Sequence, residues 1–329
     1  AQAVLAQGSS DAKRRLAASP FRPMAGESAS MRPRSDFPAD VIDTHIHLSR
    51  HYSGGLKNEW HPDETESFRR DWTEEDYLAS VAKGSCKVKA AVFVECFNRP
   101  PVEEARWVLK MIDDPNSVVV AMSAQISVQK GAAAVAEFLD ELREADGALP
   151  TGLKGARMVF PAAENKAPDC CIEPRFLEGL AELGKHGLLW EFCVHPYMAP
   201  CIPECVSKFP DMTFIVDHLA HNGNEGGAME TWGPAIDAIG KCPNVYCKMG
   251  ASEEWGVTNK SEYMDRAIAA FGFDRILYES NWFVNEAMGD SYDTTANLLL
   301  EACDRAGATA EDLAKVFRGN AMKAYRLEI

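Results

Sequence analysis

Two histidines separated by a single residue, His45 and His47, directly follow the short strand-like run VIDT at 41–44. In an extended segment alternate side chains project to one face, so both imidazoles can converge on one point while Ile46 faces away. Imidazole nitrogen is a preferred ligand of divalent transition metals such as zinc. The spacing therefore predicts a divalent metal site built on His45 and His47.

Two more histidines end later apolar runs: His195 in FCVHPYM and His218 in IVDHLAHN. Their positions predict that they lie at the same level of the fold as the first pair. The ordinary pKa of an imidazole, near 6.5, suits a group that orients or deprotonates water, and we interpret His218 in that catalytic role. Core packing is the alternative for both residues. His221, in the following loop, is predicted to lie on the surface.

Charged side chains also fall on the strand-like runs. Glu95 ends AAVFVE and could orient an imidazole from behind. Cations aimed into a site suit a substrate carboxylate or a developing oxyanion, and Arg157 is the preferred candidate because arginine binds a carboxylate through two bonds. Lys154 and Lys248 are further candidates, and surface salt bridging is the alternative for all three cations. Three aromatic residues could wall a ring-shaped substrate or simply pack in the core: Tyr197, Trp255 and Trp282.

The run YESNWFV places Asn281 where an acidic residue would complete a metal-bound hydrolytic centre. An amide carries no negative charge and cannot act as a general base. Either another group supplies the charge, or the reaction runs with a weakly held metal or with none.

The elements that must position these residues alternate along the chain. Short apolar runs and amphipathic stretches of roughly ten to fifteen residues follow one another, as in repeated βα units on a parallel sheet. Eight such strands predict an α/β fold, the (β/α)8 TIM barrel, whose reacting groups lie at the C-terminal ends of the strands. The predicted strands are 41–44, 90–95, 118–124, 152–160, 188–194, 213–218, 244–250 and 275–280. The predicted helices include 103–112, 134–145, 175–187, 261–272 and 295–307.

We divide the chain into an N-terminal extension, 1–40, and one TIM-barrel domain, 41–329. The extension is rich in Ala, Ser, Pro and Arg without sustained periodicity, which predicts a disordered or surface-wrapped segment. Its composition also resembles an organelle transit peptide, so a targeting remnant is the alternative. The first connection, 49–72, is aromatic, charged and glycine-containing, as expected of an active-site flap.

Composition excludes several classes of function. The 329 residues include 49 acidic and 34 basic ones, a net charge of -15, which argues against a nucleic-acid partner because phosphate contacts require a basic face. No apolar run approaches the length of a membrane span. The ten cysteines include no C-x-x-C pair, and we interpret them as small apolar fillers in a reducing intracellular compartment, the cytoplasm or an organelle matrix.

From about residue 41 to 327 the sequence resembles the amidohydrolase superfamily, and within it the amidohydrolase 2 branch of metal-dependent hydrolases. The resemblance rests on DTHIHL, FPDMTFIVDHLAHN, FGFDRILYESNWFV and VFRGNAMKAYRL, in that order. It implies that His45, His47 and His195 are metal ligands and that His218 assists the reacting group. Asn281 stands where metal-requiring members have an aspartate, so the implied zinc or manganese is in doubt.

The branch contains lactone hydrolases, such as sugar-acid lactonases and the 2-pyrone-4,6-dicarboxylate lactonase, and non-redox decarboxylases of aromatic or muconate-type acids. LKGARMVF and YESNWFV resemble the lactonase side, and the VHP around His195 resembles the decarboxylase side. We expect a hydrolase that opens a small cyclic ester, a sugar-acid lactone or a carboxylated ring. The alternatives are a metal-dependent decarboxylase and a catalytically inactive ligand-binding barrel. The expected partner is a small-molecule substrate, and the oligomeric state, including a homo-oligomer, stays open.

Overall fold

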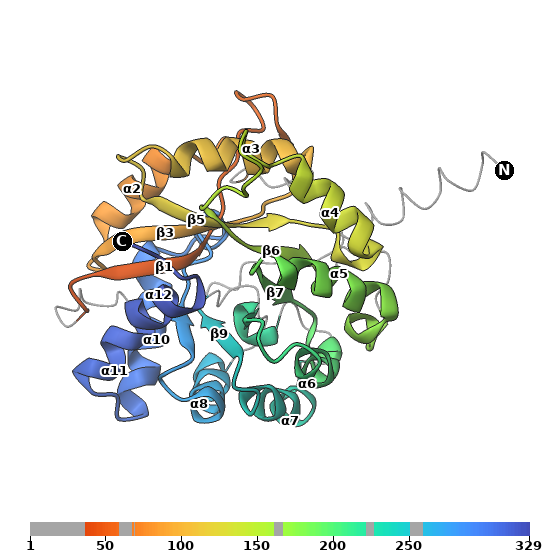
Figure 1. Cartoon of the computed structure of the whole chain (residues 1–329). Coiled ribbons are helices and arrows are strands. Elements are labelled where there is room, and N and C mark those ends of the chain that lie inside the picture. The colour runs from red at the N-terminus through yellow and green to blue at the C-terminus, as the bar shows by residue number, and fades with distance from the viewer. Residues whose placement is uncertain (1–36, 59–67, 69, 161–166, 222–226, 251–258) are drawn as a thin grey trace, which may run out of the picture.

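The computed structural model describes residues 37–58, 68, 70–160, 167–221, 227–250 and 259–329 (Figure 1). Eight parallel strands form one sheet in the order β1-β3-β5-β6-β7-β8-β9-β10. Their bounds are β1 Val41–Ile46, β3 Val88–Val94, β5 Val119–Gln125, β6 Leu153–Val159, β7 Leu189–Cys193, β8 Phe214–Val216, β9 Val245–Met249 and β10 Ile276–Tyr278. All eight predicted strands are confirmed, and with them the (β/α)8 TIM-barrel class.

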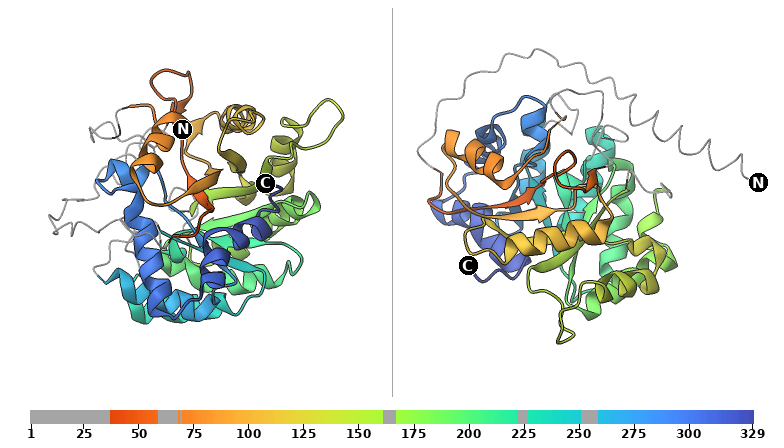
Figure 2. Two further views of the ribbon diagram at one scale, coloured as in Figure 1. Left: turned by 90° about the vertical axis from the view of Figure 1, so that its left-hand side faces the viewer. Right: turned by 90° about the horizontal axis from the view of Figure 1, so that it is seen from above.

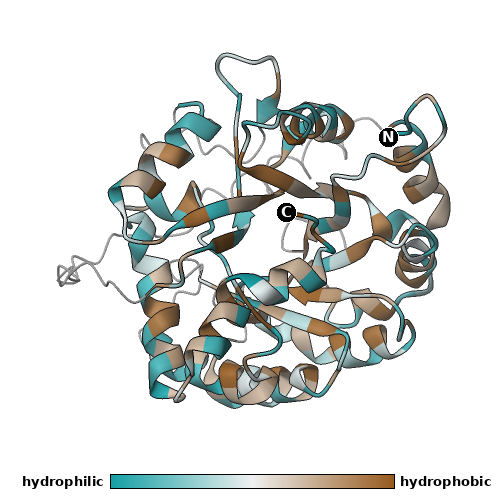
Figure 3. Ribbon diagram, turned by 60° about the vertical axis from the view of Figure 1, so that its left-hand side comes forward, coloured by the Kyte–Doolittle hydropathy of each residue, from teal (hydrophilic) through white to brown (hydrophobic). Residues whose placement is uncertain are grey.

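Helices surround the strands in every view (Figure 2), and apolar residues run along the strands while polar ones recur on the outer helices (Figure 3). The helices are α2 Glu74–Lys83, α3 Pro101–Ile112, α4 Ala132–Asp140, α5 Pro174–Lys185, α6 Ile202–Ser207, α7 Met229–Gly240, α8 Lys260–Phe271, α9 Val284–Ala287, α10 Tyr292–Arg305, α11 Ala310–Ala314 and α12 Asn320–Ala324. All five predicted helices are present. α4 ends earlier than predicted, at Asp140, because Arg143 stabilises a turn there by bonding to Asp140 and Gly147.

The first and last strands complete the barrel through a small number of contacts. Thr44 donates its hydroxyl to the Tyr278 carbonyl at 2.7 Å, and Ile46 forms an isolated parallel bridge with Trp282. Figure 1 shows α12 beside β1, near the start of that strand. The chain after α12 brings Tyr325 against the apolar residues that fill this end of the barrel.

The interior of the barrel has an apolar layer and, one step closer to the C-terminal ends of the strands, a charged layer. Because side chains alternate along a strand, the inward-facing Leu189 is followed two positions later by an inward-facing Glu191. The apolar layer contains Ile42, Val92, Ala121, Leu189, Ile215 and Leu277. The charged layer contains Arg157, Glu191, Asp217, Lys248 and Glu279, each at most 4% exposed. Ionisable groups therefore gather where TIM barrels carry their active sites.

The cysteines differ in part from the prediction. Cys171 and Cys201 form a disulfide that joins the η4 turn (Cys170–Ile172) to η5 (Pro196–Cys201). The interpretation of all cysteines as apolar fillers is therefore wrong for this pair. The other eight form no disulfide within the described residues, and seven of them are buried, as expected of small apolar side chains. The reducing compartment stays a prediction.

Two predicted segments lie partly outside the described residues. Of the N-terminal extension, the structure describes only 37–40, where Phe37 packs edge-on against Phe317. Of the predicted flap, the strand β2 (Lys57–Asn58) pairs antiparallel with β4 (Asn98–Arg99). Among the described residues, no helix is both long and apolar enough to cross a membrane.

Candidate active site

His45 and His47 lie side by side at the end of β1, with their Nε2 atoms 3.2 Å apart. The pairing of β1 with β3 shifts between Asp43 and Ile46, where β1 carries an extra residue. Without this bulge, strict alternation would put both imidazoles on the outward face of Asp43, whereas the bulge turns them inward. Nδ1 of His47 lies 2.9 Å from the Val94 carbonyl, which leaves its Nε2 facing His45. The structure thus brings the predicted pair together.

Glu279, just beyond β10, contacts two imidazoles with one carboxylate. Its oxygen Oε2 lies 3.3 Å from Nδ1 of His45 and 3.0 Å from Nδ1 of His218. The two rings are 4.7 Å apart between centroids, so His218 joins the His45 site as predicted. Sequence reasoning missed Glu279, although it follows the inward-facing Leu277 by two positions. That alternation was the signal that could have found it.

Arg157 is held by two acids inside the barrel. Its Nη1 lies 2.7 Å from Oε1 of Glu95, and its Nε lies 3.3 Å from Oδ2 of Asp217. Glu95 therefore pairs with Arg157 and not, as expected, with an imidazole. Arg157 is only 4% exposed and both of these contacts are internal, and its expected role in binding a substrate carboxylate stays a prediction.

Lys248 is the second internal cation and is fully buried. It bonds to Glu191, lies 3.2 Å from Oδ1 of Asp217 and lies 3.2 Å from Nδ1 of His45. Glu191 also accepts a hydrogen bond from the Tyr325 hydroxyl at 2.8 Å, which ties the layer to the closed end of the barrel. Like Arg157, Lys248 is engaged by acids of the protein itself. Sequence reasoning missed Glu191 and Asp217, which follow the inward-facing Leu189 and Ile215 by the same two-residue step.

Burial and neighbouring charges shift the titration of these groups. Burial lowers the pKa of His45 well below its usual value, helped by the Lys248 ammonium, and burial with Arg157 lowers the pKa of His47 to about 3. Burial also raises the pKa of Glu191 to about 7 against the opposing effect of Lys248. At Asp217 burial raises the pKa, but Lys248, with His45, outweighs it and holds that pKa well below its usual range. His45 and His47 are therefore neutral at pH 7 and can donate lone pairs.

The charges and the donor atoms of this layer fit a divalent metal. Together with Glu95, the layer has four buried carboxyl groups and two buried cations, an excess of acidic groups that a bound cation would offset. The carboxylates are Glu95, Glu191, Asp217 and Glu279, and the cations are Arg157 and Lys248. The 3.2 Å between the Nε2 atoms of His45 and His47 is close to the roughly 3.3 Å that separates two nitrogen ligands of a tetrahedral zinc ion. Triads with ligand atoms within 4.8 Å of one another are His45–His218–Glu279, His45–Glu191–Asp217 and Cys193–Asp217–His218.

The remaining predicted metal position, His195, does not belong to any of these triads. His195 is half-buried and stacks on Tyr197, with centroids 5.5 Å apart and ring planes 22° from parallel. Asn281 is fully buried, and among the described residues neither polar atom of its side chain has a hydrogen-bond partner. An unpaired buried amide is rare in folded proteins and is often explained by function.

Of four other residues singled out in the sequence, three are placed by the structure. Lys154 lies at the start of β6, where the pairing with β5 shifts, and donates to the Arg326 carbonyl at 3.3 Å. Trp282 is 1% exposed and packs edge-on against Trp72, as a core residue does. His221 is buried, not on the surface as predicted, and contacts the Gly227 carbonyl. Trp255 lies outside the described residues.

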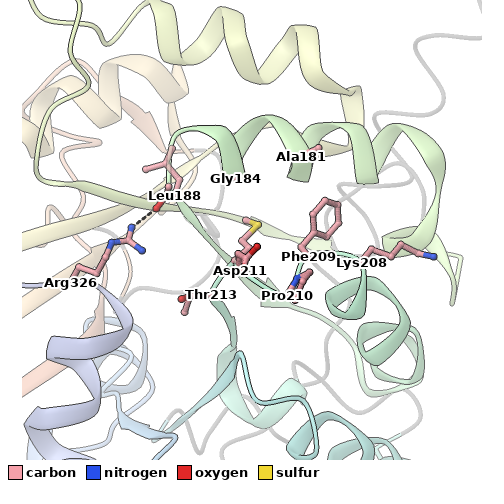
Figure 4. Close-up of a pocket in the computed structure, with 11 residues that line it drawn as sticks. Ala181, Gly184, Leu188, Lys208, Phe209, Pro210, Asp211, Thr213 and Arg326 are labelled. Atoms are coloured by element: carbon pink, nitrogen blue, oxygen red, sulfur yellow. Dashed lines mark hydrogen bonds between the residues drawn. The ribbon is translucent and has the colours of Figure 1, made fainter.

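A separate hollow of about 340 Å³ opens at the other end of the barrel, beside the starts of β7 and β8 (Figure 4). Arg326 lies at one edge of it, and Lys208 and Phe209 lie at the other. It contains none of the predicted site residues, and in TIM barrels this face carries stability more than chemistry.

The profile of the amidohydrolase family matches residues 42–327. The chain belongs to this family. This amidohydrolase is 27% identical over 305 residues to the uncharacterised protein y4mH of Sinorhizobium fredii, a match that covers 87% of this chain and 98% of that one. It is 23% identical over 167 residues to the L-fucono-1,5-lactonase of Burkholderia multivorans, covering 46% of this chain and 56% of the lactonase. The predicted resemblance is confirmed.

Solved structures share the fold of this amidohydrolase. An amidohydrolase from Burkholderia multivorans with bound zinc superposes with a TM-score of 0.72 at 20% identity, covering 88% of this chain and 100% of that one. A probable 2-pyrone-4,6-dicarboxylic acid hydrolase from Acinetobacter baumannii gives 0.63 at 13% identity, with 87% and 99% covered. The 5-carboxyvanillate decarboxylase from Sphingomonas paucimobilis gives 0.57 at 11% identity, with 88% and 100% covered. These likenesses establish the barrel.

Proposed function

We propose that this amidohydrolase opens a small, uncharged cyclic ester, a lactone of the sugar-acid type, by hydrolysis. The observation that carries the proposal is the contact of His218 with Glu279 beside the His45/His47 pair. His218, which would accept a proton from water, then lies beside the His45/His47 pair, where a bound metal would polarise the ester carbonyl. The similarity to an L-fucono-1,5-lactonase supports the same reaction class.

In this mechanism His218 accepts a proton from water as the water oxygen attacks the ester carbonyl carbon. The bond between that carbon and the ring oxygen then breaks, and the ring oxygen takes up a proton, so the product is an open hydroxy acid. Glu279, bound at Nδ1, keeps a proton on that nitrogen and leaves Nε2 of His218 as the basic atom. A divalent metal on His45 and His47 would polarise the carbonyl.

The charges around the site favour a neutral substrate over a carboxylated ring. Arg157 and Lys248 are both buried and paired with acids of the barrel, so neither is offered to a substrate carboxylate. A lactone that bears hydroxyl groups needs hydrogen-bond partners instead, and the unpaired amide of Asn281 is one. Tyr197, stacked on His195, is the described aromatic residue that we assign to the ring of the substrate.

The test is a panel of sugar-acid lactones, pyrone dicarboxylates and aromatic acids, followed by acid release for hydrolysis and carbon dioxide release for decarboxylation. We expect opening of one or more neutral lactones, and a loss of about 100- to 10,000-fold in kcat for His218→Ala. The matched control is His186→Ala, at a half-buried helix end paired with Glu182, which should keep full activity. Carbon dioxide release without lactone opening, or full activity of His218→Ala, would contradict the proposal.

A further inference from the structure

We propose that Asp43 is a positioning residue, whose buried carboxyl group joins the backbone of His45 to that of Ser280 and so sets how the imidazole pair faces the residues that follow β10. Those residues include Glu279 and Asn281, on either side of Ser280. The inference concerns the geometry of the site and does not depend on which ester is hydrolysed.

The contact of Asp43 with His45 lies inside the bulge of β1. A bulge leaves the extra residue of a strand without its partner in the ladder, and a buried N–H group without a partner is costly. Oδ1 of Asp43 accepts a hydrogen bond from the backbone N–H of His45, at 3.3 Å. Aspartate commonly bonds in this way to its own backbone two residues further on. The carboxyl group therefore stabilises the local backbone that turns both imidazoles inward.

The same oxygen atom also bonds to the segment after the last strand, β10. Oδ1 of Asp43 accepts a hydrogen bond from the backbone N–H of Ser280 at 3.0 Å. Two residues further along both segments, the backbone N–H of His47 donates to the Trp282 carbonyl at 2.5 Å. The two segments are thus joined at both ends, and Asn281 lies between the joined residues of the second segment.

The other oxygen atom of Asp43 is held by two helices. Oδ2 accepts a hydrogen bond from the Tyr77 hydroxyl of α2 at 2.9 Å and from the Tyr292 hydroxyl of α10 at 2.7 Å. Asp43 and Tyr77 are fully buried and Tyr292 is 6% exposed, so a rotated carboxyl group would leave buried polar groups without partners. The carboxyl group is therefore fixed in one orientation, as expected of a group that positions a site.

The distances within the site depend on this joint. Oε2 of Glu279, the residue before Ser280, lies 3.3 Å from Nδ1 of His45. A misplacement of about 1 Å by a substitution outside the reacting groups can lower a rate by about 100-fold. Asp43 bonds to backbone and to tyrosine hydroxyls, so it acts on the site through the two segments that it joins.

The experiment records the ring signals of His45, His47 and His218 by NMR, in the full chain labelled at histidine and treated with a chelator, beside urea unfolding of the same samples. We expect Asp43→Leu, which has a similar shape but accepts no hydrogen bond, to shift these signals. Asp43→Asn should leave them in place, because its amide oxygen accepts both backbone N–H bonds and its amino group donates to the tyrosine hydroxyls. On any lactone that the protein opens, kcat of Asp43→Leu should fall by about 10- to 100-fold.

The matched control is Asn320→Leu, at a buried amide that donates to the carbonyls of Phe273 and Ile276 near the start of β10. It should lower the urea midpoint and leave the three histidine signals in place. Asp43→Glu serves if the leucine variant does not fold. It keeps the charge but carries the oxygen atoms one methylene further, so it should also shift the signals.

Unchanged histidine signals in folded Asp43→Leu or Asp43→Glu overturn the inference. A shift in Asn320→Leu as large as that in Asp43→Leu also overturns it, because the effect would then be general to buried polar groups. An equally large shift in Asp43→Asn overturns it as well, because the charge and not the hydrogen bonds would then matter. The NMR measurement uses no substrate, so if no lactone is opened but the expected shifts are found, the proposed function fails and this inference stands.

Discussion

Replacing Lys248 with methionine should destabilise the folded barrel by about 3–5 kcal/mol at pH 8, the usual cost of breaking a buried ion pair from one side. Methionine keeps much of the length and volume of the lysine but carries no charge. Glu191 and Asp217, both fully buried, would each lose the ammonium that lies against them. The cost is large because neither carboxylate can reach water to recover its solvation.

The loss should depend on pH, in a direction set by Glu191. Burial already raises its pKa to about 7 against the effect of Lys248, so removing Lys248 raises that pKa further. The folded variant then keeps a proton that the unfolded chain releases near pH 4.5. Its stability therefore falls as pH rises from 5 to 8, by up to about 1.4 kcal/mol per pH unit for this one proton. The penalty of Lys248→Met is smaller at pH 6 than at pH 8.

The assay is urea unfolding followed by far-ultraviolet circular dichroism at both pH values. Lys154→Met is the matched control, because Lys154 is only partly buried and its ammonium makes a long bond to a backbone carbonyl. We expect less than about 0.5 kcal/mol from it. Adding Glu191→Gln to Lys248→Met should recover part of the loss at pH 8. A Lys248→Met protein within about 1 kcal/mol of the unaltered one at pH 8 would refute the reasoning.

Two further predictions concern single positions. Burial and the neighbouring Glu95 raise the pKa of Glu104 to about 8, so the free energy of unfolding should fall by up to about 1.4 kcal/mol per pH unit between pH 5 and 8. Urea unfolding at several pH values should show that Glu104→Gln removes this part of the pH dependence. Gly250→Ala should lower the melting temperature by several degrees, because a Cβ at residue 250 would lie 1.7 Å from the Glu279 carbonyl oxygen. The control Gly184→Ala, whose Cβ would have its nearest neighbour 3.9 Å away, should be neutral or stabilising. Equal melting temperatures of the two variants would contradict this prediction.

The sequence predicted the barrel because its strands are short apolar runs separated by helical periodicity, and this pattern reports burial directly. It also predicted the pairing of His45 with His47, although the bulge that turns them inward left no recognisable signal. The three missed acids are different. Acidic residues are ordinarily exposed, so Glu191, Asp217 and Glu279 are informative only once alternation places them on the inward face.

For the two cations, the sequence did not reveal which acids they contact. Arg157 and Lys248 were assigned to a substrate because cations near a site suggest an anionic ligand, but the acids that neutralise them come from other strands. Contacts between strands far apart in sequence are not readable from one strand at a time. The disulfide between Cys171 and Cys201 has the same origin, since 30 residues separate its ends.

The neutral side chain at residue 281 can be compared with its backbone and with its surroundings. Asn281 has a left-handed backbone, with φ of 52°, as has His218, with φ of 50°. Asparagine and aspartate both tolerate this conformation, so the backbone does not explain the amide. The surroundings offer a reason: two residues earlier on the same strand end, Glu279 already places a carboxyl group against the imidazoles of His45 and His218. An aspartate at 281 would add a second fully buried carboxyl group beside it, and a buried charge without a partner is costly. The amide at residue 281 therefore adds hydrogen-bonding groups to the buried site without adding a charge.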